Sequence, residues 1–253
     1  MNQDARANDA ELLRRSVASF GEIIATVGLW GDGAGSVVRW PDAIGARLDR
    51  LGRNPWFNAA VVPADESVPV DDPLLPYCLW TLGLEVPGRT EDVAISTPCM
   101  GMVLESFSAG DQVASGEADD LADLVTPSLA ELGAMNDRAY ETGPVLAPMA
   151  ARIQDDRIAT HGLRKDGRLA CVLMTLTLGD DLGIHYVATD PARRRMGLAT
   201  RLVSEVLTRG CAAGLRTATL QASPDGLPVY RRMGFRQVGV LHGFVRTLGG
   251  QVS

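Results

Sequence analysis

Apolar positions in the C-terminal half of the chain follow strand spacing first and helix spacing afterwards. Three apolar runs, at 158–163, 169–178 and 184–189, predict consecutive strands. Between the first two runs lies the pair Asp166-Gly167, which is typical of a tight hairpin turn. The three runs therefore predict an antiparallel meander.

After this meander the spacing changes to that of a helix. Apolar side chains share one face of it: Leu198, Leu202, Val203, Val206 and Leu207. Gly214 is placed to end this helix, because glycine readily adopts the left-handed conformation found at helix ends. A strand at 217–222, a short helix at 228–233 and closing strand structure at 235–245 follow. Strands and helices thus alternate through this half.

The N-terminal half has a weaker pattern. Helices are predicted at 9–27 and 42–51, and at the start of the second half at 121–140 and 149–154. The third is either continuous or broken near Pro127. Strands are predicted at four more: 37–40, 58–62, 79–86 and 100–106. A loop rich in proline and acids is expected at 64–76. The small, polar, acidic stretch at 108–120 is the predicted linker, which gives two domains, 1–115 and 116–253.

Charge differs between the two halves. Residues 1–130 hold 8 basic and 20 acidic residues, whereas residues 131–253 hold 16 basic and 11 acidic ones. A basic half suits an anionic ligand. Nucleic acid would be one such ligand, but aromatic residues make up only 5% of the chain, so base-stacking platforms are scarce. We therefore expect no nucleic-acid partner.

Three other classes of site or location are disfavoured. No run of 18 apolar residues predicts a membrane span, and the start of the chain lacks the pattern of a secretory signal, so a cytoplasmic location is expected. The four cysteines form no C-x-x-C pair, and the three histidines lack ligand spacing. We therefore expect neither disulfides nor a metal site.

The segment 184–203 runs from a strand through an arginine-rich turn into a helix. The first turn of a helix has backbone N–H groups without partners at the positive end of the helix dipole, and such an end binds phosphate. Gly197 and Ala199 would let a diphosphate approach the backbone closely, and Arg193–Arg195 add positive charge. The pattern also fits a basic helix start with small residues chosen for packing.

A second segment, LQASPDGLPVYRRMGF at 220–235, follows in the order strand, loop, short helix with a tyrosine, Gly-Phe. The two segments, in this order and at this spacing, resemble the motifs of the GNAT superfamily of N-acetyltransferases over about residues 121–246. The resemblance implies an α/β (α+β) fold with a mixed, mostly antiparallel sheet flanked by helices. It also implies acetyl-CoA as co-substrate, without a metal, and direct attack by a primary amine in a ternary complex.

The layout of the N-terminal half is similar to degenerate halves of tandem GNAT proteins, so residues 1–115 are interpreted as a smaller, GNAT-like α/β half. That half would shape the acceptor pocket or a dimer surface, or would only stabilise the chain. An exposed edge strand could support a homodimer.

Matching the motifs residue by residue implies a coenzyme site. Its members are Val187, Ala188, Thr189, Arg194, Arg195, Met196, Gly197, Leu198, Ala199, Thr200, Ser223 and Tyr230. In this family the strand that ends at Thr189 binds the pantetheine arm and splays from the next strand, and a backbone N–H near Val187 polarises the thioester carbonyl. Tyr230 matches the tyrosine that protonates the departing thiolate. The alternative for Tyr230 is a core tyrosine packed beside Phe235.

The base and the acceptor site are left open. On a regular strand Asp181, His185 and Val187 share one face, so Asp181 or His185 could take the proton of the amine. The alternatives are a turn carboxylate and an ordinary sheet histidine. Asp137 could pair with a cationic amine and Tyr140 could wall its pocket, or both could lie on the surface at a helix end.

Two functions other than an acetyltransferase are also compatible with the sequence. A module that binds acyl-CoA without turnover would keep the same fold and coenzyme turn, although the retained Tyr230 speaks against it. A nucleic-acid-binding protein would use the basic half alone. The acceptor, a small-molecule or peptide amine, is not determined by the residues.

Overall fold

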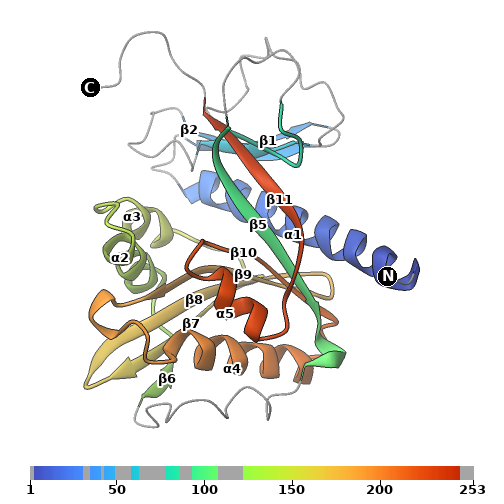
Figure 1. Ribbon diagram of the computed structural model, residues 1–253. Coiled ribbons are helices and arrows are strands. Elements are labelled where there is room, and N and C mark those ends of the chain that lie inside the picture. Colours follow the sequence, from blue (N-terminus) through green and yellow to red (C-terminus); the bar gives the residue numbers. More distant parts are fainter. Residues whose placement is uncertain are drawn as a thin grey trace.

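The fold is described here from a computed structural model (Figure 1). It describes residues 3–30, 35–40, 43–48, 58–62, 78–85, 93–107 and 122–245. The predicted loop at 64–76 and the predicted linker at 108–120 lie outside these ranges.

The described strands form one sheet in the order β1-β2-β3-β4-β11-β5-β10-β9-β8-β7-β6. Their bounds are β1 Gly35–Trp40, β2 Ala43–Leu48, β3 Ala59–Val61, β4 Cys78–Thr81, β5 Val93–Val103, β6 Asp123–Val125, β7 Ile158–Lys165, β8 Arg168–Leu178, β9 Asp181–Thr189, β10 Thr217–Gln221 and β11 Arg236–Val245. Only the β3–β4 and β9–β10 pairs are parallel. The fold is thus α+β with a mixed, mostly antiparallel sheet, as expected.

Helices flank this sheet (Figure 1). They are α1 Gln3–Trp30, α2 Leu129–Ala139, α3 Leu146–Ala150, α4 Leu198–Ala212 and α5 Leu227–Arg232, with single 3-10 turns η2 Leu104–Ser106 and η4 Pro191–Arg193. This confirms the predicted first helix, the meander, and the strand–helix alternation after it.

Strand β8, the third from one edge of the sheet, shows how both faces are covered. Its successive side chains point to opposite faces. Val172 and Met174 pack with Ile23 of α1 and Leu132 of α2. Leu173 packs on the other side, in the core that contains the apolar face of α4 and Tyr230 of α5. Burying each such large side chain contributes roughly 1.5–3 kcal/mol.

Strand β5 lies inside the sheet of the C-terminal half. It pairs with β10 on one side and β11 on the other, although these two strands are consecutive in the sequence. The sheet therefore continues across the predicted boundary between 1–115 and 116–253, while the division itself stays a prediction.

Two predicted helices are wrong in whole or in part. The segment 42–51 contains strand β2, because Ala43–Leu48 pairs along its length with β1 and also with β3, and this pairing outweighs weak helical periodicity. The segment 121–140 begins as strand β6, which pairs with β7. Helix α2 starts only after Pro127, where Ser128 and Glu131 form a capping box.

Boundaries shift elsewhere. β4 ends at Thr81, well before the predicted 86. β5 begins at Val93 and ends at Val103, where η2 replaces the last predicted strand residues. The helix predicted at 149–154 is α3, which begins and ends earlier, because the carboxylate of Asp137 accepts hydrogen bonds from the amides of Leu146 and Ala147 at its start.

Candidate active site

Strands β9 and β10 part at their C-terminal ends. Their parallel ladder runs from the pair Asp181–Thr217 to the pair Ile184–Leu220. β9 then continues to Thr189 beside β8, with no described strand on its other side. The parting leaves backbone of β9 unpaired along this stretch.

The unpaired stretch contains a β-bulge. The register between β8 and β9 shifts between Val172 and Met174, and Tyr186 has a φ of 52°, which is unusual for a bulky residue. The bulge also reverses which face each side chain takes. Val187 packs in the core with Tyr230, whereas His185 lies on the α1 side, so the predicted common face for the two is wrong.

Two side chains at the C-terminal end of α2 donate hydrogen bonds to carbonyls of this bulge. The amide of Asn136 donates to the carbonyl of Tyr186 at 3.0 Å, and the hydroxyl of Tyr140 donates to the carbonyl of Val187 at 3.0 Å. The sequence reasoning missed Asn136. Its only signal was the four-residue spacing from Tyr140, which puts both on one face of a helix.

The turn between β9 and α4 lies on the surface. Arg195 and Gly197 have φ values of 64° and 74°, and Gly197 is the N-cap of α4. The first helical bond runs from the amide of Arg201 to the carbonyl of Gly197, so the amides of the preceding turn have no partner within the helix. Met196 is 40% exposed, while Leu198 is buried and anchors the helix in the core.

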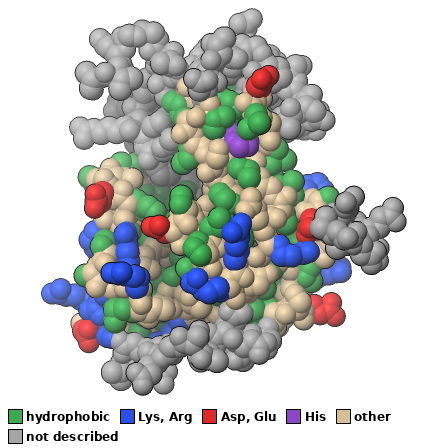
Figure 2. Space-filling model, viewed as in Figure 1, with side chains coloured by type: hydrophobic (Ala, Val, Ile, Leu, Met, Phe, Trp, Pro, Cys, Tyr) green, Lys and Arg blue, Asp and Glu red, His purple; other side chains and the backbone are tan. Residues whose placement is uncertain are grey.

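Arginine side chains tie this turn to its surroundings. Arg194 donates to the carbonyl of Ala139 at 2.7 Å and thereby binds the C-terminal end of α2. Arg193 pairs with Asp166 at 3.1 Å, in the β7–β8 turn. Figure 2 shows basic side chains gathered on the face that carries α4 and α5. Unlike Arg193 and Arg194, Arg195 forms no hydrogen bond or ion pair with another described residue.

Tyr230 packs beside Phe235 in the core, which is one of its two predicted alternatives. Its ring is 7% exposed and lies edge-on to Phe235, with ring centroids 5.9 Å apart. Burial raises its pKa, and the neighbouring Tyr140 and Cys171 raise the pKa further. None of the described residues hydrogen-bonds its hydroxyl. The hydroxyl of Ser223 accepts from the amide of Gly226 and its carbonyl accepts from the amide of Leu227, in the turn that leads into α5.

Asp181 is buried beneath α1. Its two carboxylate oxygens accept from the hydroxyls of Thr217 and Thr219, each at 2.6 Å. Burial raises the pKa of Asp181 despite these bonds. Arg15 of α1 bonds both Thr217 and Asp180, the neighbour of Asp181, so the turn before β9 also anchors the N-terminal helix.

His185 lies on the same α1-covered face. Its Nε2 is 2.9 Å from the hydroxyl of Ser19 in α1, and the residue is 6% exposed. Burial lowers its pKa to about 3, so the imidazole is neutral at physiological pH.

The two predicted acceptor residues differ in environment. Asp137 is buried, and its carboxylate accepts from the amides of Leu146 and Ala147 and from the hydroxyl of Thr142, at 2.8–3.1 Å. Tyr140 is 55% exposed at the end of α2, with its hydroxyl on the carbonyl of Val187. The carboxylate of Asp137 thus binds the start of α3. Of the two residues, only Tyr140 is exposed to solvent near the bulge.

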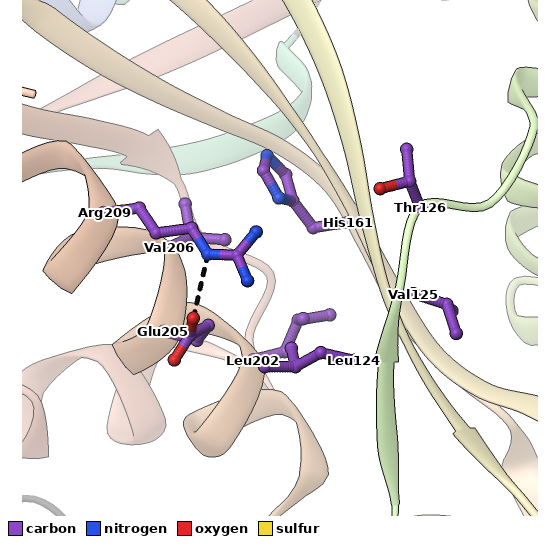
Figure 3. A pocket seen from close by; sticks show the side chains of 8 residues that line it. All are labelled: Leu124, Val125, Thr126, His161, Leu202, Glu205, Val206 and Arg209. Carbon is purple, nitrogen blue, oxygen red and sulfur yellow. Dashed lines mark hydrogen bonds and ion pairs between the residues drawn. The ribbon is translucent and has the colours of Figure 1, made fainter.

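A separate hollow lies between β6, β7 and α4 (Figure 3). Glu205 and Arg209 of α4 form an ion pair of 2.8 Å beside it, and His161 of β7 lies across from them. Burial lowers the pKa of His161 to about 4, and the charge of Arg209 acts in the same direction. None of the predicted site residues lines this hollow.

The described part of the chain contains no helix long and apolar enough to cross a bilayer. Within the same residues, no three His, Cys, Asp or Glu side chains are grouped so as to hold a metal ion.

Comparison with known proteins assigns the fold. A family described as acetyltransferase (GNAT) domain matches residues 134–243. A GCN5-related N-acetyltransferase from Kribbella flavida is similar in structure, with a TM-score of 0.60 and 17% identity over 94% of this chain and 96% of that one. A GCN5-related N-acetyltransferase-like protein from Streptococcus suis 89/1591 has a TM-score of 0.52 and 15% identity over 94% and 99%. No curated protein matches the chain. The match to the family model over the splayed strands, the exposed turn and α5 identifies residues 134–243 as a GNAT acetyltransferase domain, and the two similar structures show that the chain has the GNAT fold.

Proposed function

We propose that this protein transfers the acetyl group of acetyl-CoA to a primary amine by direct attack in a ternary complex. The observation that carries the proposal is the exposed turn at Arg195–Gly197, which starts α4 next to the unpaired end of β9. A helix start with free amides suits a diphosphate, and an unpaired strand end suits an extended pantetheine arm.

The proposed coenzyme site follows from this geometry. The amides of the turn would hold the pyrophosphate, with Arg195 and Thr200 beside it, and the backbone from Val187 to Thr189 would bond the arm. Arg194 would act mainly through α2, since its guanidinium already binds the carbonyl of Ala139. Ser223 would shape the other wall by holding the turn that leads into α5.

In the proposed reaction the amine nitrogen attacks the thioester carbon, a C–N bond forms and the C–S bond breaks. The amide of Val187 would stabilise the negative charge that develops on the carbonyl oxygen. Tyr230 would donate its phenolic proton to the departing sulfur. Burial raises the pKa of Tyr230, so the phenol holds its proton until negative charge develops on the sulfur.

For the base, we favour His185 over Asp181. Among the described residues the hydroxyl of Ser19 is the one side-chain partner of His185, so its other ring nitrogen could accept the proton. Both oxygens of Asp181 are already bonded to threonines of β10. Tyr140 would contact the acceptor, a small-molecule or peptide amine, whereas the carboxylate of Asp137 is occupied.

The test combines binding with turnover. Acetyl-CoA at 100 times its dissociation constant should stabilise the protein by about 2.7 kcal/mol in thermal unfolding. Release of free thiol should then be followed with a panel of primary amines. Absence of stabilisation would refute the coenzyme site. Stabilisation without thiol release from any amine would instead favour the non-catalytic acyl-CoA module.

A further inference from the structure

A buried amide on α2 contacts the bulge of β9. Asn136 is 4% exposed, and its Nδ2 donates to the carbonyl of Leu132 at 3.2 Å and to the carbonyl of Tyr186 at 3.0 Å. The first bond lies within the helix. The second joins the helix to the strand, at the residue with φ of 52°.

That backbone conformation needs support from outside the strand. A bulky residue at positive φ is strained and persists where the surroundings fix it. Among the described contacts, Asn136 and Tyr140 supply side-chain bonds to two consecutive carbonyls of the bulge. Because Tyr140 is largely exposed and Asn136 is buried, Asn136 is the permanent restraint of the two.

The hydrogen bond from Asn136 to Tyr186 also fixes the direction in which the N–H of Val187 points. In a trans peptide the C=O and the N–H of one peptide group point in opposite directions. Since the carbonyl of Tyr186 points to α2, the amide of Val187 points away from α2. The side chain of Val187 packs in the core that contains Tyr230, so this strand residue and the proposed acid belong to one cluster.

We propose that Asn136 is a positioning residue that aims the amide of Val187 at the carbonyl oxygen of the bound acyl group. This rests on the proposed function, because it assumes that a thioester lies in the slot. Asn136 touches no reacting atom, and it acts by holding one peptide group in the orientation that stabilises the developing oxyanion.

The test needs no knowledge of the acceptor. Acetyl-CoA labelled with 13C at the thioester carbonyl is bound to the wild-type protein and to Asn136→Leu, and its carbonyl stretching frequency is measured by infrared difference spectroscopy. A hydrogen bond from Val187 lowers this frequency relative to free acetyl-CoA. Asn136→Leu should return it toward the free value, while affinity for unacetylated CoA changes by less than about threefold.

The matched control weakens the same helix at its other end. Ser128→Ala removes the capping box of α2 and so weakens the helix, without touching the bulge. It should keep the wild-type frequency. A wild-type frequency in Asn136→Leu, or an equal change in Ser128→Ala, would overturn the positioning role. Failure of the wild-type protein to bind acetyl-CoA would instead overturn the proposed function.

Should Asn136→Leu fail to fold, the wild-type protein provides the second measurement. With valine labelled by 15N, the amide signal of Val187 should shift more with acetyl-CoA than with CoA, and Asn136→Ala bound to CoA should show the Val187 signal displaced. Equal shifts with the two ligands, or an undisplaced signal in Asn136→Ala, would contradict the inference.

Discussion

At the scale of single residues, hydrogen-bond partners within the fold decide which candidate side chains are free to take part in a reaction. Asp137 and Asp181 looked as reactive in the sequence as Tyr230 and His185. In the fold, both carboxylates are buried and fully bonded, Asp137 by the start of α3 and Asp181 by two threonines. The hydroxyl of Tyr230 has no such partner among the described residues.

Tyr230→Phe tests the proposed acid. The ring would keep its edge-on packing against Phe235, so the fold and the affinity for acetyl-CoA should stay nearly unchanged. Turnover should fall by roughly 10²–10⁴-fold, the usual contribution of a general acid. Thiol release and acetyl-CoA titration measure the two quantities. Unchanged turnover would leave Tyr230 a packing residue only.

His185→Gln tests the buried imidazole through the pH dependence of stability. The unfolded chain binds the proton of His185 near pH 6.5, whereas the folded chain binds it only near pH 3. Between these values unfolding takes up a proton, so lowering the pH removes about 1.4 kcal/mol of stability per pH unit. The variant, which can still bond Ser19, should lose about 2 kcal/mol less than wild type between pH 6.5 and 5.

Chemical unfolding at several pH values measures this difference. His161 titrates in the same direction and is present in both proteins, so it cancels in the comparison. Parallel stability curves for the two proteins would contradict the burial of a neutral His185.

At the scale of elements, α4 illustrates how one helix end can carry function while the other carries only structure. Gly197 precedes the helix with a φ of 74°, and Gly214 follows it with a φ of 79°. A Cβ at either position would meet no described atom within 4 Å, so a substitution changes backbone strain and not packing.

Gly197→Ala and Gly214→Ala therefore form a matched pair. Each should lower the free energy of unfolding by about 1 kcal/mol, because alanine tolerates positive φ poorly. Only Gly197→Ala should also weaken acetyl-CoA binding, by distorting the amides of the proposed cradle. Calorimetric titration of both variants checks this. Equal affinity of the two variants for acetyl-CoA would contradict a coenzyme site at the turn of Gly197.

At the scale of the whole molecule, the N-terminal half completes the sheet of the C-terminal half. β5 fills the place between β10 and β11, and α1 covers His185 and Asp181. Ion pairs of Glu22 with Arg157 and of Arg15 with Asp180 join α1 to the second half. The acidic and basic halves thus meet in a shared core.

A fragment of residues 116–253 tests this dependence. Without β5 it would expose the facing edges of β10 and β11, and without α1 it would expose the apolar side chains that pack on Ile23. We expect no cooperative thermal transition in circular dichroism, and recovery of one when the fragment 1–115 is co-expressed. A fragment that unfolds cooperatively on its own would support 116–253 as an independent domain.

The sequence by itself determined the elements of 158–245 and the GNAT domain they belong to, because strong periodicity, turn glycines and two spaced motifs are local properties. Other features were decided by tertiary structure alone. The insertion of β5, the strand at Ala43–Leu48 and the burial of Asp181 depend on partners far away in the chain. The bulge at Tyr186 and its bond to Asn136 are likewise invisible locally, since a register shift exists only between two paired strands.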